Sequence, residues 1–429
     1  MSLTMFGLVG IGVLVAMIFL LRIPVGFAMG IVGFCGFWAV LDVHAALGML
    51  GDETWKVFSS YGLTVIPLFI LMGQICFYSG LNGRLYRAAY AWMGPVHGGV
   101  AMATVLACAG FAAISGSNTA TAATMSSVAL PQMKKYGYDP ILSTGTVAAA
   151  STLGAVIPPS IVLIVIGLQT GQSIAALFWA ALVPGVLLVV FFIMRIVMVC
   201  KKHPDLGPAG PSTGWGEKFR SLKGSLEMVV LFALVMGGLV AGLFTPSEAG
   251  AAGAALALAV SWAGGNLTWK RLVNSIRDTL SISCMIMTIV LGAVIFGRFL
   301  AVTRIPFTLA SQVAELAFPP LVILGLICLL YILGGAIMDA LALLIITIPI
   351  FFPVAATLGY DPLWFAVVVT VVTTMGAITP PVGVNTFIVS AMAGDVPLAH
   401  VFRGVAIFLP CYLACLALLI LWPGILNIF

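Results

Sequence analysis

Polar side chains gather at one point of an otherwise apolar sequence, in the run Ser115-Gly116-Ser117-Asn118-Thr119-Ala120-Thr121. Five of these seven residues carry a hydroxyl or an amide, and oxygens of this kind are the ligands that hard cations such as Na⁺ prefer. The ends of helices at such a run can also hold an anionic group. A packing seam of small residues is the alternative, which suits Ala122–Ser127 but not Asn118. The run therefore predicts a site for an ion or an anion.

Two pairs of consecutive prolines interrupt apolar segments elsewhere. They lie in Gly154-Ala155-Val156-Ile157-Pro158-Pro159-Ser160 and in Gly376-Ala377-Ile378-Thr379-Pro380-Pro381. Proline lacks an N–H group and its ring clashes with the preceding turn, so each pair predicts a broken helix with unpaired carbonyl groups. Unpaired carbonyls are costly in lipid unless a cation or a polar group uses them. Proline kinks satisfied by Ser, Thr and water are the alternative, but two breaks at equivalent places favour cation sites.

Asp339 is the one acidic residue that hydropathy places well inside a membrane segment, in Gly334-Gly335-Ala336-Ile337-Met338-Asp339. A carboxylate there is costly and indicates a function by default. Its alternative role is to cap the helix that follows, which is compatible with lining a cation site. Glu248, by contrast, belongs to the first turn of a helix with Thr245 as its cap and Pro246 at its first position, and we assign it no role in transport.

Composition limits the class of protein. Of the 429 residues, 62% are hydrophobic and 7% are charged, and the mean hydropathy is +1.21, which excludes an ordinary soluble enzyme. No nucleotide-binding GxxxxGK[ST] loop, no CxxC pair among the eight cysteines and no catalytic constellation of side chains appears in the sequence. The dispersed net charge of +5 does not form a nucleic-acid surface. We therefore expect an all-α polytopic membrane protein that is not an enzyme.

Hydropathy predicts ten spans and two re-entrant helical hairpins. The hairpins cover residues 98–134 and 319–355, because each consists of two apolar arms too short to cross the bilayer around a polar or glycine-rich middle. Residues 81–92 and 266–280 are expected to lie along the interface as connecting arms. The predicted spans are 4–21, 23–41, 58–79, 140–170, 174–200, 226–244, 246–264, 280–301, 362–393 and 401–426.

An internal repeat divides the chain. Pro131, Gly137-Tyr138-Asp139-Pro140 and Gly154–Pro159 recur 222 residues later, as Pro353, Gly359-Tyr360-Asp361-Pro362 and Gly376–Pro381. The first repeat is residues 1–200, the linker 201–225 and the second repeat 226–429. Each repeat holds five spans and one hairpin, and an odd number of crossings predicts that the second repeat is inverted in the bilayer.

The distribution of cations predicts the orientation. With the N-terminus in the periplasm, fifteen of the eighteen Lys and Arg residues lie on or near one side, and only Lys56, Arg298 and Arg304 lie opposite. The positive-inside rule makes the crowded side, with the linker, cytoplasmic. The first hairpin then enters from the cytoplasm and the second from the periplasm. Residues 4–21 lack a preceding basic region, so we expect a retained helix and not a signal peptide.

These motifs together resemble one family. The run 115–121, the segment Gly154–Ser160, Thr170-Gly171-Gln172-Ser173-Ile174 and Thr379-Pro380-Pro381-Val382-Gly383-Val384-Asn385 are similar to the large membrane subunit of tripartite ATP-independent periplasmic (TRAP) transporters. The resemblance covers nearly the whole chain. It implies an elevator fold of the ion transporter superfamily, with a scaffold domain and a transport domain, in the bacterial inner membrane.

The same resemblance implies the activity and the partners. The expected function is sodium-coupled import of organic acids, such as C4-dicarboxylates or sialic acid, with two or more Na⁺ ions. The expected partners are a separate small four-helix membrane subunit, a periplasmic substrate-binding protein and membrane lipid, with no nucleic acid. Two alternatives stay open from the residues alone, a stand-alone sodium/dicarboxylate symporter of the same superfamily and an anion channel.

The resemblance also implies the ligands. It places one Na⁺ between Ser115, Ser117 and Asn118 of the first hairpin and Gly154 and Ile157 of the first break. A second Na⁺ is expected at Gly335, Asp339, Gly376, Thr379 and Pro381. The second hairpin lacks the Ser-Asn-Thr triplet of related symporters, so backbone carbonyls are expected to hold this ion. The substrate is expected near seven residues, Thr119, Thr121, Pro158, Pro159, Ser160, Pro380 and Asn385.

Overall fold

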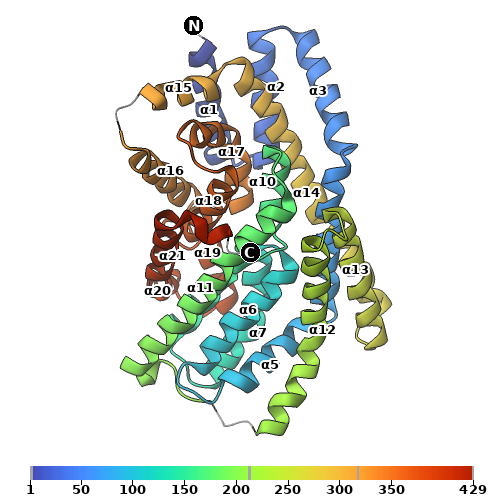
Figure 1. Cartoon of the computed structure of the whole chain (residues 1–429), viewed down its shortest axis with the longest axis vertical. Coiled ribbons are helices and arrows are strands. Elements are labelled where there is room, and N and C mark those ends of the chain that lie inside the picture. The colour runs from blue at the N-terminus through green and yellow to red at the C-terminus, as the bar shows by residue number, and fades with distance from the viewer. Residues whose placement is uncertain (1–2, 211–213, 316–317, 428–429) are drawn as a thin grey trace.

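The first half of the chain is a series of helices. The computed structural model describes residues 3–210, 214–315 and 318–427, and all regular elements in these ranges are helical (Figure 1). Those of the first half are α1 (Leu3–Phe19), α2 (Val25–Val40), α3 (Val43–Phe58), η1 (Tyr61–Thr64), α4 (Val65–Tyr78), α5 (Leu81–Met93), α6 (Gly99–Ser115), α7 (Asn118–Lys135), α8 (Pro140–Ser151), α9 (Leu153–Val156), α10 (Ile161–Thr170), α11 (Ile174–Lys202) and η2 (Pro204–Leu206).

Elements of the second half follow in a matching order. They are α12 (Trp215–Val240), α13 (Pro246–Ala263), α14 (Trp269–Val302), α15 (Ile305–Glu315), α16 (Pro320–Gly335), α17 (Ala340–Thr357), α18 (Pro362–Gly376), α19 (Val384–Ala393), α20 (Leu398–Ala406), α21 (Leu409–Leu421) and η3 (Pro423–Asn427). Moved along the chain by 222 residues, the bounds of α7 coincide with those of α17. The sequence period therefore corresponds to a period of helices.

Length and composition make the chain an integral membrane protein. Among the described residues, five helices are long and apolar enough to cross a membrane, or seven if each of two bent pairs counts as one span. Other apolar helices, such as α1 and α2, have 17 and 16 residues, somewhat fewer than the roughly 20 of a typical span. Both predicted hairpins form, as α6–α7 and α16–α17 (Figure 1).

The predicted boundaries were wrong in one pair of places. Residues 266–280 and 280–301 were expected to form an arm and a span, but α14 joins them in one helix of 34 residues. In the first half α3 is the arm and η1–α4 is the span, and the two are separated at Ser59-Ser60-Tyr61-Gly62. The equivalent Ser281-Ile282-Ser283-Cys284 has no glycine and continues the helix.

The other boundary errors lie near the linker and in the last span. Helix α12 begins at Trp215, inside the predicted linker 201–225, whose residues 211–213 lie outside the described ranges. Trp215, Phe219 and Leu222 repeat at helical spacing, which accounts for the early start. The expected span 401–426 consists of α20 and α21, bent by 42°. The predicted helix start at Thr245 is confirmed, with a capping box to Glu248.

The two halves are interlocked through α2 and α14, which pack closely, as do α4 and α13. Glycines make this approach possible. A Cβ atom on Gly292 would lie 2.1 Å from the Gly26 carbonyl oxygen, and one on Gly33 would lie 2.7 Å from the Phe296 backbone. Small residues allow membrane helices to approach in this way. The first and second halves therefore share one packed unit.

Replacement of Gly292 by alanine should destabilise the protein. The new methyl group would collide with the Gly26 backbone, so α2 and α14 must separate. Gly297→Ala on the same helix is the matched control, because nothing lies within 4 Å of its Cβ position and alanine favours a helix over glycine by about 0.5–1 kcal/mol. Thermal unfolding in detergent should show a lower melting temperature for Gly292→Ala only. Equal melting temperatures would contradict this view of the crossing.

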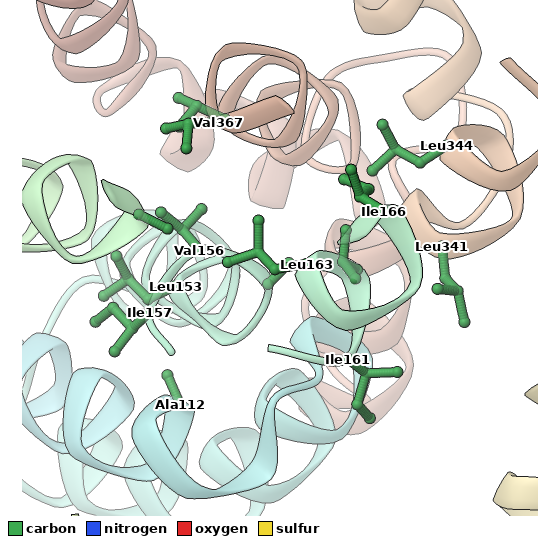
Figure 2. Close-up of a cluster of buried hydrophobic side chains, with 14 of the residues drawn as sticks. Ala112, Leu153, Val156, Ile157, Ile161, Leu163, Ile166, Leu341, Leu344 and Val367 are labelled. Carbon is green, nitrogen blue, oxygen red and sulfur yellow. The ribbon is translucent and has the colours of Figure 1, made fainter. Parts of the chain in front are cut away.

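A second exchange between the halves brings the breaks and the hairpins together. Helix α10 follows the first break and packs on α17 of the second hairpin, and α19 follows the second break and packs on α7 of the first. Ile161 and Ile166 of α10 lie toward Leu341 and Leu344 of α17, within a buried apolar cluster (Figure 2). Each broken helix is thereby positioned by the hairpin of the other half.

Candidate ion and substrate site

The first hairpin turns at Gly116. Helix α6 ends at Ser115, Gly116 adopts a φ of +61°, and Ser117 caps α7 by accepting a hydrogen bond from the Ala120 N–H at 3.3 Å. A positive φ of this kind suits glycine. We call residues 115–121 tip 1. The turn aims the N-terminal end of α7, with its unpaired N–H groups, away from the hairpin arms.

Hydroxyl groups of tip 1 form a connected network. Thr121 Oγ1 donates to the Ser117 carbonyl at 2.7 Å and lies 3.0 Å from Ser115 Oγ, while Ser117 Oγ and Thr119 Oγ1 are 3.1 Å apart. Asn118 is only 4% exposed, and its Nδ2 has no hydrogen-bond partner among the described residues. A buried amide of this kind is costly unless something binds it.

The first break packs directly on tip 1. Helix α9 ends at Val156, and the backbone resumes at Ser160, which caps α10 by accepting from the Leu163 N–H at 3.4 Å. The Gly116 carbonyl accepts from the Ile161 N–H at 3.2 Å. A Cβ atom on Gly154 would lie 2.4 Å from the Ser117 carbonyl oxygen. Tip 1 and the break are therefore in backbone contact, as a shared ion site requires.

The second hairpin and the second break meet in a similar way. The Ala336 carbonyl accepts from the Val382 N–H at 3.1 Å and from the Gly383 N–H at 2.8 Å. Gly335 and Gly376 lie against each other, since a Cβ on Gly376 would be 2.9 Å from Gly335 Cα. We call residues 334–339 tip 2. Its groups are mainly backbone groups, in keeping with the missing hydroxyl triplet.

A cavity of about 330 Å³ lies between the two tips. Tip 1 contributes Gly116–Ala120, tip 2 contributes Asp339, and Leu341 of α17 and Ile161 of α10 complete that wall. The first turns of three helices, α7, α10 and α17, thus border one polar space. Helix N-termini favour negative charge, and a cavity of this size suits a small organic ligand.

The structure divides the predicted residues into two groups. Ser117, Asn118, Thr119 and Asp339 line the cavity, and Asp339 also caps α17 by accepting from the Leu341 N–H at 3.0 Å. The others form the packed contacts behind it, namely Ser115, Thr121, Gly154, Ile157, Pro158, Pro159, Ser160, Gly335, Gly376, Thr379, Pro380, Pro381 and Asn385.

Several of those residues are held by internal hydrogen bonds. Ser160 Oγ donates to the Ala155 carbonyl at 2.6 Å, and Thr379 Oγ1 donates to the Met375 carbonyl at 2.7 Å. Asn385 is fully buried and its Nδ2 donates to Ser151 Oγ at 2.9 Å, while its Oδ1 has no partner in the described chain. These side chains therefore shape the breaks and do not line the cavity in this conformation.

Helix α14 supplies a part of the site that the sequence did not indicate. Ile282, Met285 and Ile286 form the cavity wall opposite the tips. Asp278, one turn earlier, lines a neighbouring cavity of about 220 Å³ with Gln74 and tip 1, and it accepts a hydrogen bond from the Tyr78 hydroxyl at 2.5 Å. Helical spacing places these four residues on one face, but nothing in the sequence links that face to the tips.

Together the helices, the two tips and the enclosed polar space define a membrane transport protein. Sequence comparison assigns its family: the chain belongs to the tripartite ATP-independent periplasmic transporters, DctM component, whose family model matches residues 11–425. The resemblance stated from the sequence is confirmed. This family consists of transporter permeases, which are not a class of enzyme.

Curated relatives agree with this assignment. The chain is 34% identical to the C4-dicarboxylate TRAP transporter large permease protein DctM of Pseudomonas aeruginosa, over 88% of both chains. It is 29% identical to the sialic acid TRAP transporter large permease protein SiaM of Vibrio cholerae, over 93% of both. It is also 31% identical to the isethionate TRAP transporter permease protein DctMQ of Oleidesulfovibrio alaskensis, over 88% of this chain and 59% of that protein.

Solved structures confirm the fold. The YdaH transporter of Alcanivorax borkumensis superposes with a TM-score of 0.62 at 16% identity, over 90% of both chains. MtrF of Neisseria gonorrhoeae superposes with a TM-score of 0.51, also at 16% identity, over 87% of this chain and 84% of that one. At this identity the likeness concerns the arrangement of helices and not the substrate.

Proposed function

We propose that this chain is the large membrane subunit of a transporter that imports an organic acid by coupling it to Na⁺. The observation that carries the proposal is the cavity of about 330 Å³, where tip 1, Asp339 and the first turns of three helices converge. Such an arrangement suits an anion that enters together with cations. The printed names of the relatives, for C4-dicarboxylate, sialic acid and isethionate, all describe organic anions.

Two sodium sites follow from the contacts between tips and breaks. The first is formed by Ser115, Ser117, Asn118, Gly154 and Ile157, and the backbone contact of Gly154 with Ser117 supports it. The second is formed by Gly335, Gly376, Thr379 and Pro381 with Asp339 near the substrate, and it uses mainly carbonyl oxygens. Bound Na⁺ would order both tips, so the anion binds well only when the ions are present.

An elevator motion of inverted repeats is the proposed mechanism. Both hairpins and both broken helices would move as one transport domain against a scaffold that includes α2, α4, α13 and α14. Repeats 1–200 and 226–429, joined by the linker 201–225, would provide equivalent hairpins open to opposite sides. The matched bounds of α7 and α17 and the exchange of α10 and α19 support this proposal.

Ion pairs support the proposed orientation in the inner membrane. Lys134, predicted to be cytoplasmic, pairs at 2.6 Å with Asp395 in the loop after α19, and this hydrogen bond holds the pKa of the Asp395 carboxyl below its usual range. Arg298, predicted to be periplasmic, pairs at 2.8 Å with Glu53 of α3. Residues predicted to share a side are therefore in contact, as expected with a periplasmic N-terminus and a cytoplasmic linker.

Two partners complete the proposed transporter. A small four-helix membrane subunit would bind the chain in the bilayer, and a periplasmic binding protein would deliver the substrate. The relative named DctMQ supports the first of these. The substrate is therefore set largely by the binding protein.

Reconstitution tests the function. Proteoliposomes containing the chain and the small subunit should take up the labelled acid only with an inward Na⁺ gradient and with the loaded binding protein outside. Replacement of Na⁺ by K⁺ should abolish uptake. Uptake without the binding protein would indicate a stand-alone symporter, and ion-independent flux at channel rates would indicate an anion channel.

Asp339→Asn separates the two roles of this residue. Asparagine is also a good helix cap, so the cap on α17 and the melting temperature should persist, while the charge beside the cavity is lost. The Na⁺ concentration for half-maximal uptake should then rise about tenfold or more, as when a group around a metal site is removed. An unchanged sodium dependence would leave Asp339 as a cap alone.

A further inference from the structure

A second cavity, of about 690 Å³, lies far from the tips, between α5, the outer end of α7 and the first turns of α12. In Figure 1 this region is at the opposite end of the molecule from α3 and α15. Three arginines line it, Arg84, Arg87 and Arg220, together with one acid, Glu217. Nothing in the proposed transport cycle uses this cavity.

The positive charge of this cavity is largely uncompensated. Arg84 forms an ion pair with Glu227 at 2.8 Å. Arg87 uses Nε to donate to the Gly83 carbonyl at 3.3 Å, and in the described part of the chain neither Arg87 nor Arg220 has a carboxylate within ion-pair distance. Two guanidinium groups therefore remain available, and their planar N–H groups suit the oxygens of a phosphate.

Aromatic rings place the mouth of the cavity at the membrane surface. Trp215 and Phe219 at the start of α12 are 69% and 60% exposed and pack edge-on against Trp92 at the end of α5. The Lys218 ammonium lies 4.9 Å from the Trp215 ring centre. Tryptophan and lysine together are typical of the headgroup level of a bilayer.

An apolar track leads from the arginines toward the interior of the bilayer. Leu222, Leu226 and Val229 of α12 are exposed and follow one another at helical spacing, so they form a continuous stripe beyond Arg220. A free phosphate ion would use the guanidinium groups only. A phospholipid would use the guanidinium groups for its headgroup and the stripe for its acyl chain.

We propose that the α5–α7–α12 cavity binds the phosphate headgroup of an anionic phospholipid. Because α7 belongs to the first hairpin and α5 and α12 do not, the lipid would hold the outer end of this hairpin against its neighbours. Regulation of transport by this lipid rests on the proposed function, whereas binding itself does not. Binding is therefore tested without transport.

Lipid binding by the purified full chain in detergent is the test. Native mass spectrometry and thermal unfolding should show retention of, and stabilisation by, phosphatidylglycerol, with little effect of phosphatidylcholine or of inorganic phosphate. In Arg87→Gln/Arg220→Gln the affinity for phosphatidylglycerol should fall about fivefold for each arginine removed. Lys201→Gln/Lys202→Gln is the matched control, because these exposed residues at the end of α11 lie outside the cavity; its affinity should be unchanged.

Three outcomes would overturn the proposal. Equal affinity of the arginine variant and the wild type would remove the site. Equal stabilisation by inorganic phosphate would identify a small-anion site, and equal retention of phosphatidylcholine would identify non-specific lipid. The last two comparisons use the wild-type chain, so they decide the matter even if the double variant does not fold. Since uptake is not measured, failure here leaves the sodium-coupled transport proposal untouched.

Discussion

Asn118→Ala is expected to abolish sodium-dependent uptake while the protein is still expressed and folded. Its amide is buried at the cavity and at the first turn of α7, and Nδ2 has no protein partner, so truncation breaks no internal hydrogen bond by that atom. Removal of a proposed ion ligand should raise the Na⁺ concentration for half-maximal uptake at least about tenfold. Uptake into proteoliposomes at graded Na⁺ concentrations measures this.

Ser127→Ala is the control for Asn118→Ala. Ser127 lies further along α7, does not line the cavity between the tips, and donates within its own helix to the Thr124 carbonyl at 2.7 Å. Its removal should leave uptake unchanged. A second readout is the rise in melting temperature on adding Na⁺, which should persist in Ser127→Ala and be reduced in Asn118→Ala, because a bound ligand stabilises the folded state. Wild-type uptake by Asn118→Ala would remove the first ion site.

Gly154→Ala should be as damaging, for a geometric reason. The added Cβ would lie 2.4 Å from the Ser117 carbonyl oxygen and 2.8 Å from Thr121 Oγ1, so tip 1 must move away by about 1 Å. A displacement of this size in a positioned site can reduce a rate by up to about 100-fold. Uptake should fall accordingly, together with the stabilisation by Na⁺. Gly376→Ala should act similarly at the second break, where its Cβ would meet the Ile332 carbonyl at 2.7 Å.

The control for both glycine variants is Gly325→Ala in α16. No atom lies within 4 Å of the Cβ position of Gly325, which is exposed on the hairpin surface. This variant should transport normally. Normal transport by Gly154→Ala, with normal sodium stabilisation, would show that the close contact of tip 1 with the break is not required. A loss of folding in Gly154→Ala but not in Gly325→Ala would limit the conclusion to packing, and Gly376→Ala then provides the functional test.

Local chemistry explains which elements could be predicted. The end of α6 at Gly116, the start of α7 at Ser117 and the capping box at Thr245 follow from residues adjacent in the sequence, because caps and turns use neighbouring backbone groups. Fusion of the arm and the span in α14 was missed, since helix continuity through residues 281–284 depends on packing against α2 and α4 as well as on propensity.

The sequence by itself determined the membrane class, the period of 222 residues, both hairpins and the polar composition of tip 1, because hydropathy, proline breaks and repeats are properties of contiguous residues. Tertiary structure decided which of these residues face a common space. Asn118, Thr119 and Asp339 border the cavity, while Asn385 is turned to Ser151, and Asp278 of α14 lies beside tip 1. These relations join residues about 160 to 230 positions apart, and only the packing of helices from both halves fixes them.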